Sequence, residues 1–431
     1  AVRLQEEGAR SLPHDAAARA APADRGDDAR DDDDVLLAMA RELPADLLGK
    51  VLDAAPFRYR IASTWERESS ATVWGPVGDP VALHGHSAAI SGIQFFPRGE
   101  RLLTWSRSSG AAIVWDARSG EAVCQIARNF TVESVRVFPD GGRLAMCSRR
   151  GECEIWGIGA GAACEGSPSI VFTVHYFIGH PWAVFDHRVL NVDIFPSGDR
   201  LLTWGREFGA TVWHASSGTT MCKLVAQDSM VTMAEVFPDG AHVATASDET
   251  RTAVVWSVSG KCAIYATLAA ADWLKAIAVL AGGDVLATAD ADGDVMAWSM
   301  KSTAEARTLE HPGHGFEDFI YHLQPLGGDL VAGVSPLAIV VWNATSGESL
   351  HHLRVVGARA VAGSPGGDLL VACGAGGVTI WALPGGAKLG QFGSRYMGLE
   401  GDAEDCLLAV GLAGALDRQG IGRGLSWRVL P

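Results

Sequence analysis

Apolar residues along most of the chain fall into short runs separated by turn residues such as Gly, Pro, Asp and Ser. Short runs rich in β-branched residues and bounded in this way are typical of strands. Many of the runs end in tryptophan, as in AAIVW, TAVVW and AIVVW. The tryptophans recur about every forty residues, which indicates a repeat architecture. They are Trp74, Trp115, Trp156, Trp213, Trp256, Trp298, Trp342, Trp381 and Trp427.

A second marker precedes the tryptophan in each unit. The early units carry Phe-Pro-x-Gly turns at Phe96–Gly99, Phe138–Gly141, Phe195–Gly198 and Phe237–Gly240. Later units carry Gly-Gly turns at Ala281–Gly283, Leu326–Gly328 and Pro365–Gly367. Each unit therefore has an apolar run on either side of this turn, a third run ending in Trp, and a fourth run after it. Four antiparallel strands per repeat of this length predict a blade of a β-propeller.

The chain resembles the WD-repeat family over residues 57–431. The residues that carry the resemblance are the Trp115-Asp116 pair, the Phe-Pro turns, and the Gly-His pairs Gly85-His86, Gly179-His180 and Gly313-His314. The resemblance implies a buried network of His, Asp, Ser or Thr, and Trp within a blade. Asp248 and Asp292 stand where that Asp is expected, but most units lack the full set. We therefore expect divergent repeats that are stabilised mainly by packing.

The fold class that these patterns predict is all-β, a single propeller of eight four-stranded antiparallel blades, with seven blades as the alternative. The first unit, 57–84, lacks a clear innermost strand, and the last unit, 394–428, offers three strands. We expect the ring to close with a strand from before about residue 85, with Pro80–Leu83 as the candidate. Closure removes the exposed sheet edges that invite aggregation.

The regions outside the repeats divide into three. Residues 1–34 are rich in Ala and Asp, and we expect a disordered acidic tail. Residues 35–56 have helical apolar spacing interrupted by Pro44, which predicts short amphipathic helices. Within them, residues 43–52 resemble the start of an F-box. The spacing between Trp156 and Trp213 is long, which predicts an insert at 157–186 that a loop or an extra hairpin would fill.

Charge and cysteine content indicate which classes of partner and which cellular compartment to expect. The net charge of −15 argues against general nucleic-acid binding, which needs a basic surface. No apolar run reaches the length of a membrane-spanning helix, so we expect no membrane partner. The eight cysteines form no CxxC pair, and we expect free, largely buried thiols in a reducing, cytoplasmic protein. We also expect a monomer.

No catalytic motif, cofactor signature or metal-ligand spacing is present in the sequence, and we expect no cofactor, metal or enzyme activity. The histidines His175, His180 and His187, and the pair His311 and His314, lack a convergent spacing.

Four arginines form the candidate partner-binding site, because each follows the second run of a successive unit: Arg67, Arg107, Arg149 and Arg206. Guanidinium groups bind carboxylates and phosphates in bidentate fashion, which favours an acidic or phosphorylated peptide as the partner. The alternative is local pairing with Glu68, Glu152 or Glu207. The adjacent Trp65, Trp105 and Trp204 are expected to fill core space between blades.

The function that follows is a non-catalytic WD-repeat scaffold that binds proteins or peptides through one rim. Two alternatives stay open. The F-box-like residues 43–52 would fit a substrate-recognition subunit of a ubiquitin ligase. A start at Ala1 rather than Met would fit a regulatory propeller from a longer signalling protein.

Overall fold

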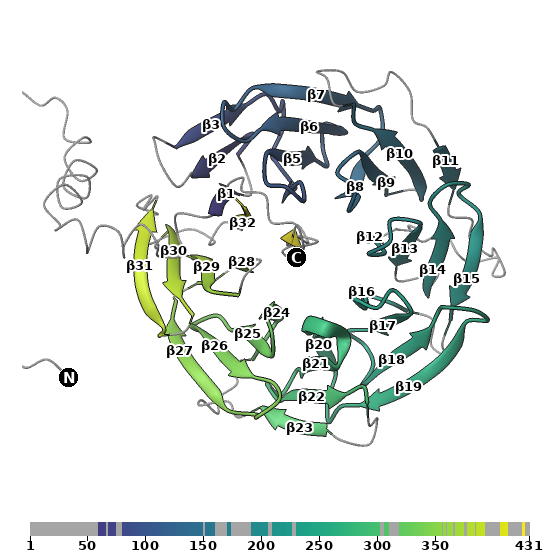
Figure 1. The fold of residues 1–431 in the computed structure, drawn as a ribbon, viewed down its shortest axis with the longest axis vertical. Helices are drawn as coiled ribbons and strands as arrows, with labels where there is room; N and C mark the ends of the chain where they lie inside the picture. The colour runs from purple at the N-terminus through teal and green to yellow at the C-terminus, as the bar shows by residue number, and fades with distance from the viewer. Residues whose placement is uncertain are drawn as a thin grey trace, which may run out of the picture. The chain divides into compact units, whose positions relative to one another are not determined.

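Eight antiparallel sheets are arranged as the blades of one β-propeller (Figure 1). The computed structural model describes residues 59–65, 68–74, 80–149, 151–159, 170–173, 191–205, 209–225, 230–301, 306–309, 319–355, 357–358, 360–364, 367–374, 377–383, 385–392, 406–412 and 425–426. The predicted tail, the amphipathic helices and the F-box-like segment lie outside these residues. The predicted fold class is confirmed, and the count is eight blades rather than seven.

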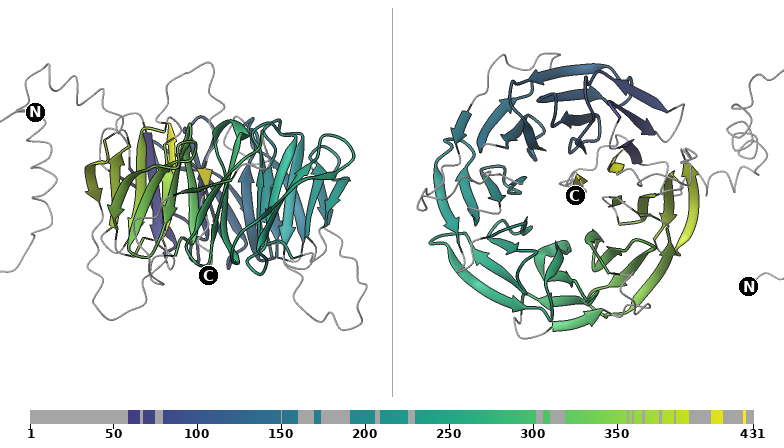
Figure 2. Two further views of the ribbon diagram at one scale, coloured as in Figure 1. Left: turned by 90° about the horizontal axis from the view of Figure 1, so that it is seen from below. Right: turned by 180° about the vertical axis from the view of Figure 1, so that it is seen from behind.

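Seven blades are each built from four consecutive strands, and the blades stand side by side around the ring (Figure 2). The first of them contains β4 (Gly92–Phe95), β5 (Arg101–Ser106), β6 (Ala111–Asp116) and β7 (Ala122–Ala127). The second contains β8 (Val132–Val137), β9 (Arg143–Ser148), β10 (Glu152–Gly157) and β11 (Ile170–Thr173). The third contains β12 (Asn191–Ile194), β13 (Arg200–Gly205), β14 (Gly209–His214) and β15 (Thr220–Leu224). The fourth contains β16 (Met233–Val236), β17 (His242–Ala246), β18 (Thr252–Ser257) and β19 (Ala263–Ala269).

The later blades repeat the same order. The fifth contains β20 (Leu274–Val279), β21 (Val285–Asp290), β22 (Val295–Ser299) and β23 (Ala306–Leu309), with the 3₁₀ turn η2 (Ala281–Gly283) between its first two strands. The sixth contains β24 (His322–Gly327), β25 (Leu330–Val334), β26 (Ala338–Asn343) and β27 (Ser349–Arg354). The seventh contains β28 (Ala360–Gly363), β29 (Leu369–Gly374), β30 (Gly377–Ala382) and β31 (Ala387–Phe392). No helix in the described residues is long and apolar enough to cross a bilayer.

The eighth blade closes the ring by combining the two ends of the repeat region. Its strand order is β3 (Val81–His84), β2 (Ser70–Trp74), β1 (Tyr59–Trp65), β32 (Cys406–Leu412) and β33 (Leu425–Ser426). Closure by mixed ends is therefore confirmed. We expected the last blade to borrow one strand from the N-terminal unit, but the N-terminal unit supplies three strands of this blade. Strand β32 lies on the inner side of β1 and pairs with it over the whole length of β1.

The insert predicted at 157–186 contains part of a blade. Strand β11 (Ile170–Thr173) pairs with β10 (Glu152–Gly157) and is the outermost strand of that blade. Part of the extra length before Trp213 is thus the fourth strand of the preceding unit, displaced along the sequence. Most of the remaining insert, with His175, His180 and His187, lies outside the described residues.

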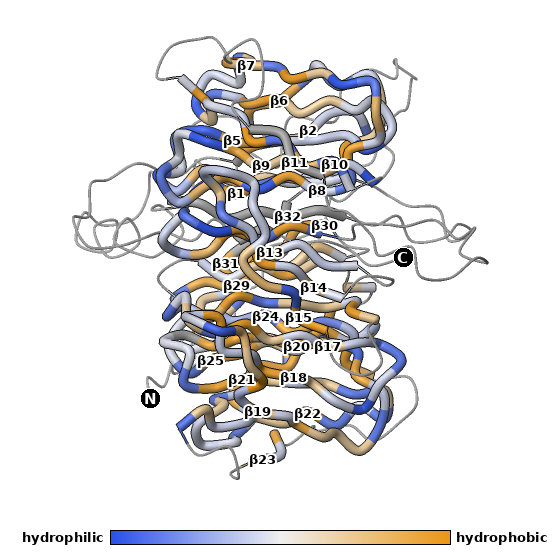
Figure 3. Tube along the Cα trace, turned by 90° about the vertical axis from the view of Figure 1, so that its right-hand side faces the viewer, coloured by the Kyte–Doolittle hydropathy of each residue, from blue (hydrophilic) through white to orange (hydrophobic). Residues whose placement is uncertain are grey.

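The recurring tryptophans lie in the core. Hydrophobic residues follow the strands, while hydrophilic residues occupy many of the turns (Figure 3). Trp115, Trp156, Trp213, Trp256, Trp342 and Trp381 are each at most 6% exposed. Trp298 is half-buried. Trp74 pairs with Ile61 within the closing blade, and Trp427 lies outside the described residues.

Of the additional tryptophans, Trp105 and Trp204 pack between blades as expected, and the side chain of Trp65 is not described. Trp105 is 4% exposed and Trp204 is 6% exposed. Trp105 packs with Val132 and Val135 of the next blade. Its ring lies against Gly92, where an added Cβ would come within 1.9 Å of a ring carbon. The absence of a side chain at Gly92 is therefore what allows a tryptophan in the second strand of this blade.

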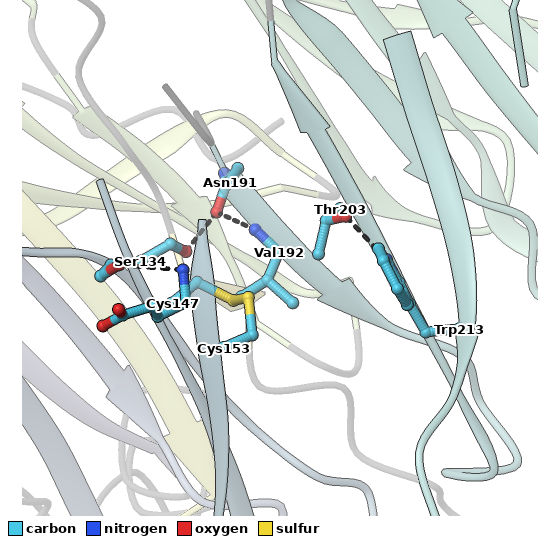
Figure 4. Close-up of a disulfide and its surroundings, with 9 residues drawn as sticks. Ser134, Cys147, Cys153, Asn191, Val192, Thr203 and Trp213 are labelled. Atoms are coloured by element: carbon cyan, nitrogen blue, oxygen red, sulfur yellow. Dashed lines mark hydrogen bonds between the residues drawn. A yellow bond between two sulfur atoms is a disulfide. The ribbon is translucent and has the colours of Figure 1, made fainter. Parts of the chain in front are cut away.

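The expectation of free thiols is wrong. Cys147 on β9 faces Cys153 on β10 as a direct cross-strand partner, and the two form a disulfide (Figure 4). A second disulfide joins Cys222 to Cys262 across neighbouring blades. No free cysteine occurs among the described residues. The linear sequence did not reveal the pairs because Cys147 and Cys153 meet only through strand register, and Cys222 and Cys262 only through blade stacking.

Candidate partner-binding rim

The turns at the two ends of the strands form two rims of different composition. We call one the Arg107 rim. It comprises the turns between second and third strands, such as Ser106–Gly110 and Asp290–Asp294, with the loops that lead into each first strand. The opposite rim, which we call the Phe-Pro rim, comprises the turns between first and second strands, such as Phe96–Gly99. Backbone bonds connect the parts of the Arg107 rim, for example from Ala291 N to Trp273 O at 2.8 Å.

Arg107 is positioned by contacts with two elements. Its backbone N donates to Ser91 Oγ at 3.0 Å, and its guanidinium lies 3.1 Å from the carboxylate of Glu133. Glu133 belongs to β8 of the next blade and is 8% exposed, whereas the Arg107 side chain is 44% exposed. The arginine thus pairs with a carboxylate across the blade boundary, not with one in its own turn.

Arg149 occupies the equivalent turn of the following blade. Its backbone N donates to Thr131 O at 3.1 Å, and the turn is closed by a bond from Gly151 N to Ser148 O at 3.1 Å. The Ser148 hydroxyl also accepts a bond from Glu152 N. Arg107 and Arg149 therefore stand at corresponding positions on one rim. Arg67 and Arg206 lie outside the described residues, so the arc of all four arginines stays a prediction.

The network implied by the family resemblance is partly formed in one blade. His86 Nε2 lies 2.7 Å from Thr104 Oγ1, which also accepts a bond from Trp115 Nε1 at 2.8 Å. Within the described residues, neither His86 Nδ1 nor Ser109 Oγ has a hydrogen-bond partner. Burial lowers the pKa of His86 to about 4, so its imidazole is neutral at neutral pH. The acid that would complete this network is absent from the turn.

The Trp–Thr bond of this network recurs in three further blades. The indole N–H donates to a threonine hydroxyl on the neighbouring strand from Trp213 to Thr203, from Trp256 to Thr245 and from Trp298 to Thr288. Trp156 has no such threonine opposite it and donates to Glu154 at 3.0 Å. This bond satisfies a buried donor, so it explains why a tryptophan rather than another large apolar residue suits the position.

A second series of arginines, on the Phe-Pro rim, was missed by the sequence reasoning. Arg143 stacks over Phe138 at 4.1 Å and donates to Gly198 O of the next blade at 3.0 Å. Arg200 stacks over Phe195 at 4.3 Å and donates to Gly240 O at 2.7 Å. The signal in the sequence is an arginine followed by leucine shortly after three of the four Phe-Pro turns, at Arg101, Arg143 and Arg200. Arg60 makes the same kind of bond to Gly99 O at 3.2 Å.

These arginines are structural, and we call them the latch arginines: Arg60, Arg101, Arg143 and Arg200. The turn glycines that accept the bonds have positive φ values, 69° at Gly198 and 66° at Gly240. This conformation favours glycine. Arg101 reaches further along the next blade, to Gly159 O at 3.3 Å. A guanidinium that has its donors occupied by main-chain carbonyls is poorly placed to bind a partner.

No group of three His, Cys, Asp or Glu side chains converges as a metal site in the described part of the chain. His175, His180, His187, His311 and His314 lie outside it.

Comparison with known proteins supports the fold at low sequence identity. No family model matches the chain. Coronin-like protein crn1 of Schizosaccharomyces pombe is 27% identical over 119 residues, which is 25% of this chain and 20% of that protein. Target of rapamycin complex subunit wat1 of the same organism is 23% identical over 183 residues, which is 41% of this chain and 53% of that protein. The chain thus matches only a fifth and about half of these relatives' lengths.

Solved structures match over more of the chain. Sqt1 of Saccharomyces cerevisiae covers 73% of this chain and 90% of its own, with a TM-score of 0.57 and 14% identity. The computationally designed Ika8 protein covers 80% and 98%, with a TM-score of 0.57 and 17% identity. The β-propeller domain of Cps50 (Swd1) of Myceliophteria thermophila covers 64% and 90%, with a TM-score of 0.50 and 15% identity. The resemblance to WD-repeat propellers is therefore confirmed at the level of the fold.

Proposed function

We propose that the protein is a non-catalytic scaffold that binds other proteins through the Arg107 rim. The fold supports this function because a propeller presents a wide, rigid face whose turns vary independently of the blade core. One of the relatives in sequence is named as a subunit of a complex, the target of rapamycin complex subunit wat1. Fold alone does not specify a partner, so the partner's chemistry has to come from the rim.

The observation that carries the proposal is the recurrence of arginine at Arg107 and Arg149 in successive turns of one rim. Arg107 keeps 44% of its side chain exposed while Glu133 holds one end of its guanidinium. The pairing fixes the arginine and compensates part of its charge. A phosphate group, with its larger charge and three acceptor oxygens, would still be attracted to such a pair, whereas a single carboxylate would gain less. A phosphorylated peptide is therefore the partner that we favour among acidic ones.

The test is binding of a phosphoserine peptide library to the whole chain, with Arg107→Glu and Arg149→Glu as variants. We expect these variants to lose binding, and the wild-type affinity to fall as salt is added. Arg98→Glu is the matched control, because Arg98 is an exposed arginine of the Phe-Pro rim. Each variant is shown to be folded by its unfolding transition. Equal binding by all variants would contradict the proposal that Arg107 and Arg149 bind the partner.

Compartment and oligomeric state stay predictions from the sequence. Disulfides such as Cys147–Cys153 and Cys222–Cys262 are more typical of proteins from oxidising compartments than of cytoplasmic proteins. The test is to compare non-reducing and reducing gels of the protein from its native source. The comparison shows whether the disulfides form there, as expected in an oxidising compartment but not in the cytoplasm.

A further inference from the structure

Two exposed aromatic side chains stand on the Arg107 rim of the later blades. Trp273 is 52% exposed and Phe319 is 37% exposed. Each immediately precedes the apolar residue that anchors the first strand of a blade, Leu274 at 1% exposed and Ile320 fully buried. In the early blade that begins with β8, the residue at this position is the exposed Thr131. A large aromatic here is therefore not needed to build a blade.

The loop that carries Trp273 is held in place by bonds to two neighbouring turns. Trp273 O accepts a bond from Ala291 N at 2.8 Å, and Leu274 N donates to Thr250 O at 3.0 Å. The next residue back, Asp272, forms an ion pair with Arg251 at 3.4 Å. The indole is consequently displayed by a fixed backbone. An aromatic held in this way loses little conformational freedom on binding, as is common for the residues that dominate interfaces.

Trp273 and Phe319 flank one turn, Ala291–Asp294. Ala291 bonds to Trp273 on one side, and on the other side a Cβ at Gly293 would lie 3.7 Å from Phe319 Cα. Gly293 has a φ of +90°, which favours glycine in this tight turn. Two residues with exposed aromatic rings, from successive blades, thus contact the same glycine-containing turn through their backbone.

The turn itself is acidic and well ordered by its own contacts. Asp290 is 1% exposed, and its carboxylate accepts bonds from Asp294 N at 3.0 Å and from Asp272 N at 3.4 Å. The side chains of Asp292 and Asp294 are exposed. Among the described residues of these turns and loops, the positively charged side chains are Arg251, which pairs with Asp272, and the half-buried Lys275. The surface therefore combines two aromatic rings with an excess of negative charge.

We propose that Trp273, Phe319, Asp292 and Asp294 form a docking surface for a basic, partly apolar segment of a partner protein. A lysine or arginine of the partner would lie over the indole face, where the ring quadrupole attracts a cation, while the two carboxylates pair with neighbouring positive groups. Apolar residues of the same segment would cover the exposed parts of the rings. This surface has the opposite charge preference to the arginine site and uses different blades, so either can fail without the other.

The experiment measures binding of short peptides of alternating arginine and leucine by calorimetry, with the whole chain as the receptor. Matched peptides carry glutamate in place of arginine. We expect Trp273→Ala to weaken binding of the basic peptide about tenfold, since a central aromatic contact is lost while the net charge stays unchanged. Asp292→Asn combined with Asp294→Asn should weaken binding by about the same factor and reduce its salt dependence.

Ile264→Ala is the control for loss of apolar surface, because Ile264 is 55% exposed on the outer strand β19. It should bind the basic peptide as the wild type does, and so should Arg107→Glu. Equal affinity of wild type and Trp273→Ala would overturn the proposal, as non-specific attraction to an acidic protein would then explain the binding. Preferential binding of the glutamate peptide would also overturn it. So would a wild-type protein that dimerises through Trp273, with dissociation of the dimer in Trp273→Ala.

Discussion

The early and later blades attach to their neighbours by different side chains. In the early blades a latch arginine at the start of the second strand donates to a turn carbonyl of the next blade, as in Arg143 to Gly198 and Arg200 to Gly240. The latch arginine pairs across the sheet with the residue that follows the recurring Trp. In the later blades the residue at this position of the second strand is aliphatic. These residues are Val285, Leu330 and Leu369.

From the fourth blade on, side chains of three outermost strands bond to the next blade. Tyr265 on β19 donates its hydroxyl to Met300 O at 3.0 Å, and Arg307 on β23 donates to Ser346 O at 2.7 Å. His351 on β27 lies 2.6 Å from Leu383 O. Each acceptor belongs to the next blade. These three bonds start from outermost strands, whereas the bonds of the latch arginines start from second strands.

The Phe-Pro turn and the latch arginine occur together in the blades of Arg101, Arg143 and Arg200, whereas Arg60 follows no such turn. The guanidinium of Arg200 is sandwiched between the Phe195 ring and a glycine carbonyl of the next turn. Where the Phe-Pro turn is replaced by Ala281–Gly283, no ring is available to stack on, and the arginine is replaced as well. His242 is intermediate, because its ring faces Phe237 at 6.0 Å and bonds to Asp239 at 2.6 Å.

The largest expected effect concerns packing in the later blades. Trp342 is fully buried and its ring lies against Gly333. Trp342→Ala should lower the free energy of unfolding by about 3–5 kcal/mol, as for other large core truncations. The half-buried Trp298 provides the comparison, and Trp298→Ala should cost clearly less. Urea unfolding followed by circular dichroism measures both, and equal losses would contradict the burial difference between them.

The next effect tests the latch itself. Arg200→Met keeps the aliphatic part of a side chain that is only 14% exposed but removes its bonds to Gly240 and its stacking on Phe195. We expect a loss of about 1.5–3 kcal/mol, because a buried carbonyl loses a charged donor. Arg307→Met is the control from the later blades, since Arg307 is exposed and should cost under about 1 kcal/mol. A reversed order would mean that the outer-strand bonds are the stronger attachment.

The sequence predicted what depends on local pattern, and it missed what depends on neighbouring units. Strand runs, turns and the tryptophan period were sufficient for the fold and the blade count. Burial of Trp105 also followed from its place in an apolar run. The latch of Arg143 was missed because its partner, Gly198, belongs to the next blade. The Cys222–Cys262 disulfide was missed for the same reason.

The candidate site was predictable only in part. That Arg107 and Arg149 occupy equivalent turns follows from the period alone. That Arg107 pairs with Glu133 does not, because Glu133 lies on the inner strand of the next blade, where the register of two separate sheets decides which side chains meet. The exposure of Trp273 was not predicted, because Trp273 directly precedes the apolar run that begins at Leu274 and does not break the apolar pattern. Its exposure is caused by the loop bonds that turn its side chain outward while Leu274 enters the core.

A smaller effect concerns pH and tests the histidine network of the early blades. The folded protein holds the pKa of His86 at about 4, below that of an unfolded histidine at about 6.5. Between these values the unfolded chain binds more protons, so stability should fall as the pH decreases from about 6.5 to about 4, by on the order of 1–2 kcal/mol. His86→Gln removes this titration, and its unfolding free energy should depend less on pH in that window. An unchanged pH dependence would show that other groups account for it.

The smallest expected effect would complete that network and would distinguish the two halves most sharply. In the early blade, His86 is present and Ser109 stands six residues before Trp115; in the later blade, Asp292 stands six residues before Trp298. Ser109→Asp should place a carboxylate near His86 Nδ1, which has no partner in the described residues. We expect a gain of about 0.5–1.5 kcal/mol and a rise in the pKa of His86, since the acid stabilises the imidazolium. Ser108→Asp adds the same charge at the neighbouring exposed position and should change stability little. A gain from both variants would point to a general charge effect, whereas a gain from Ser109→Asp alone would show that this blade lacks only its acid.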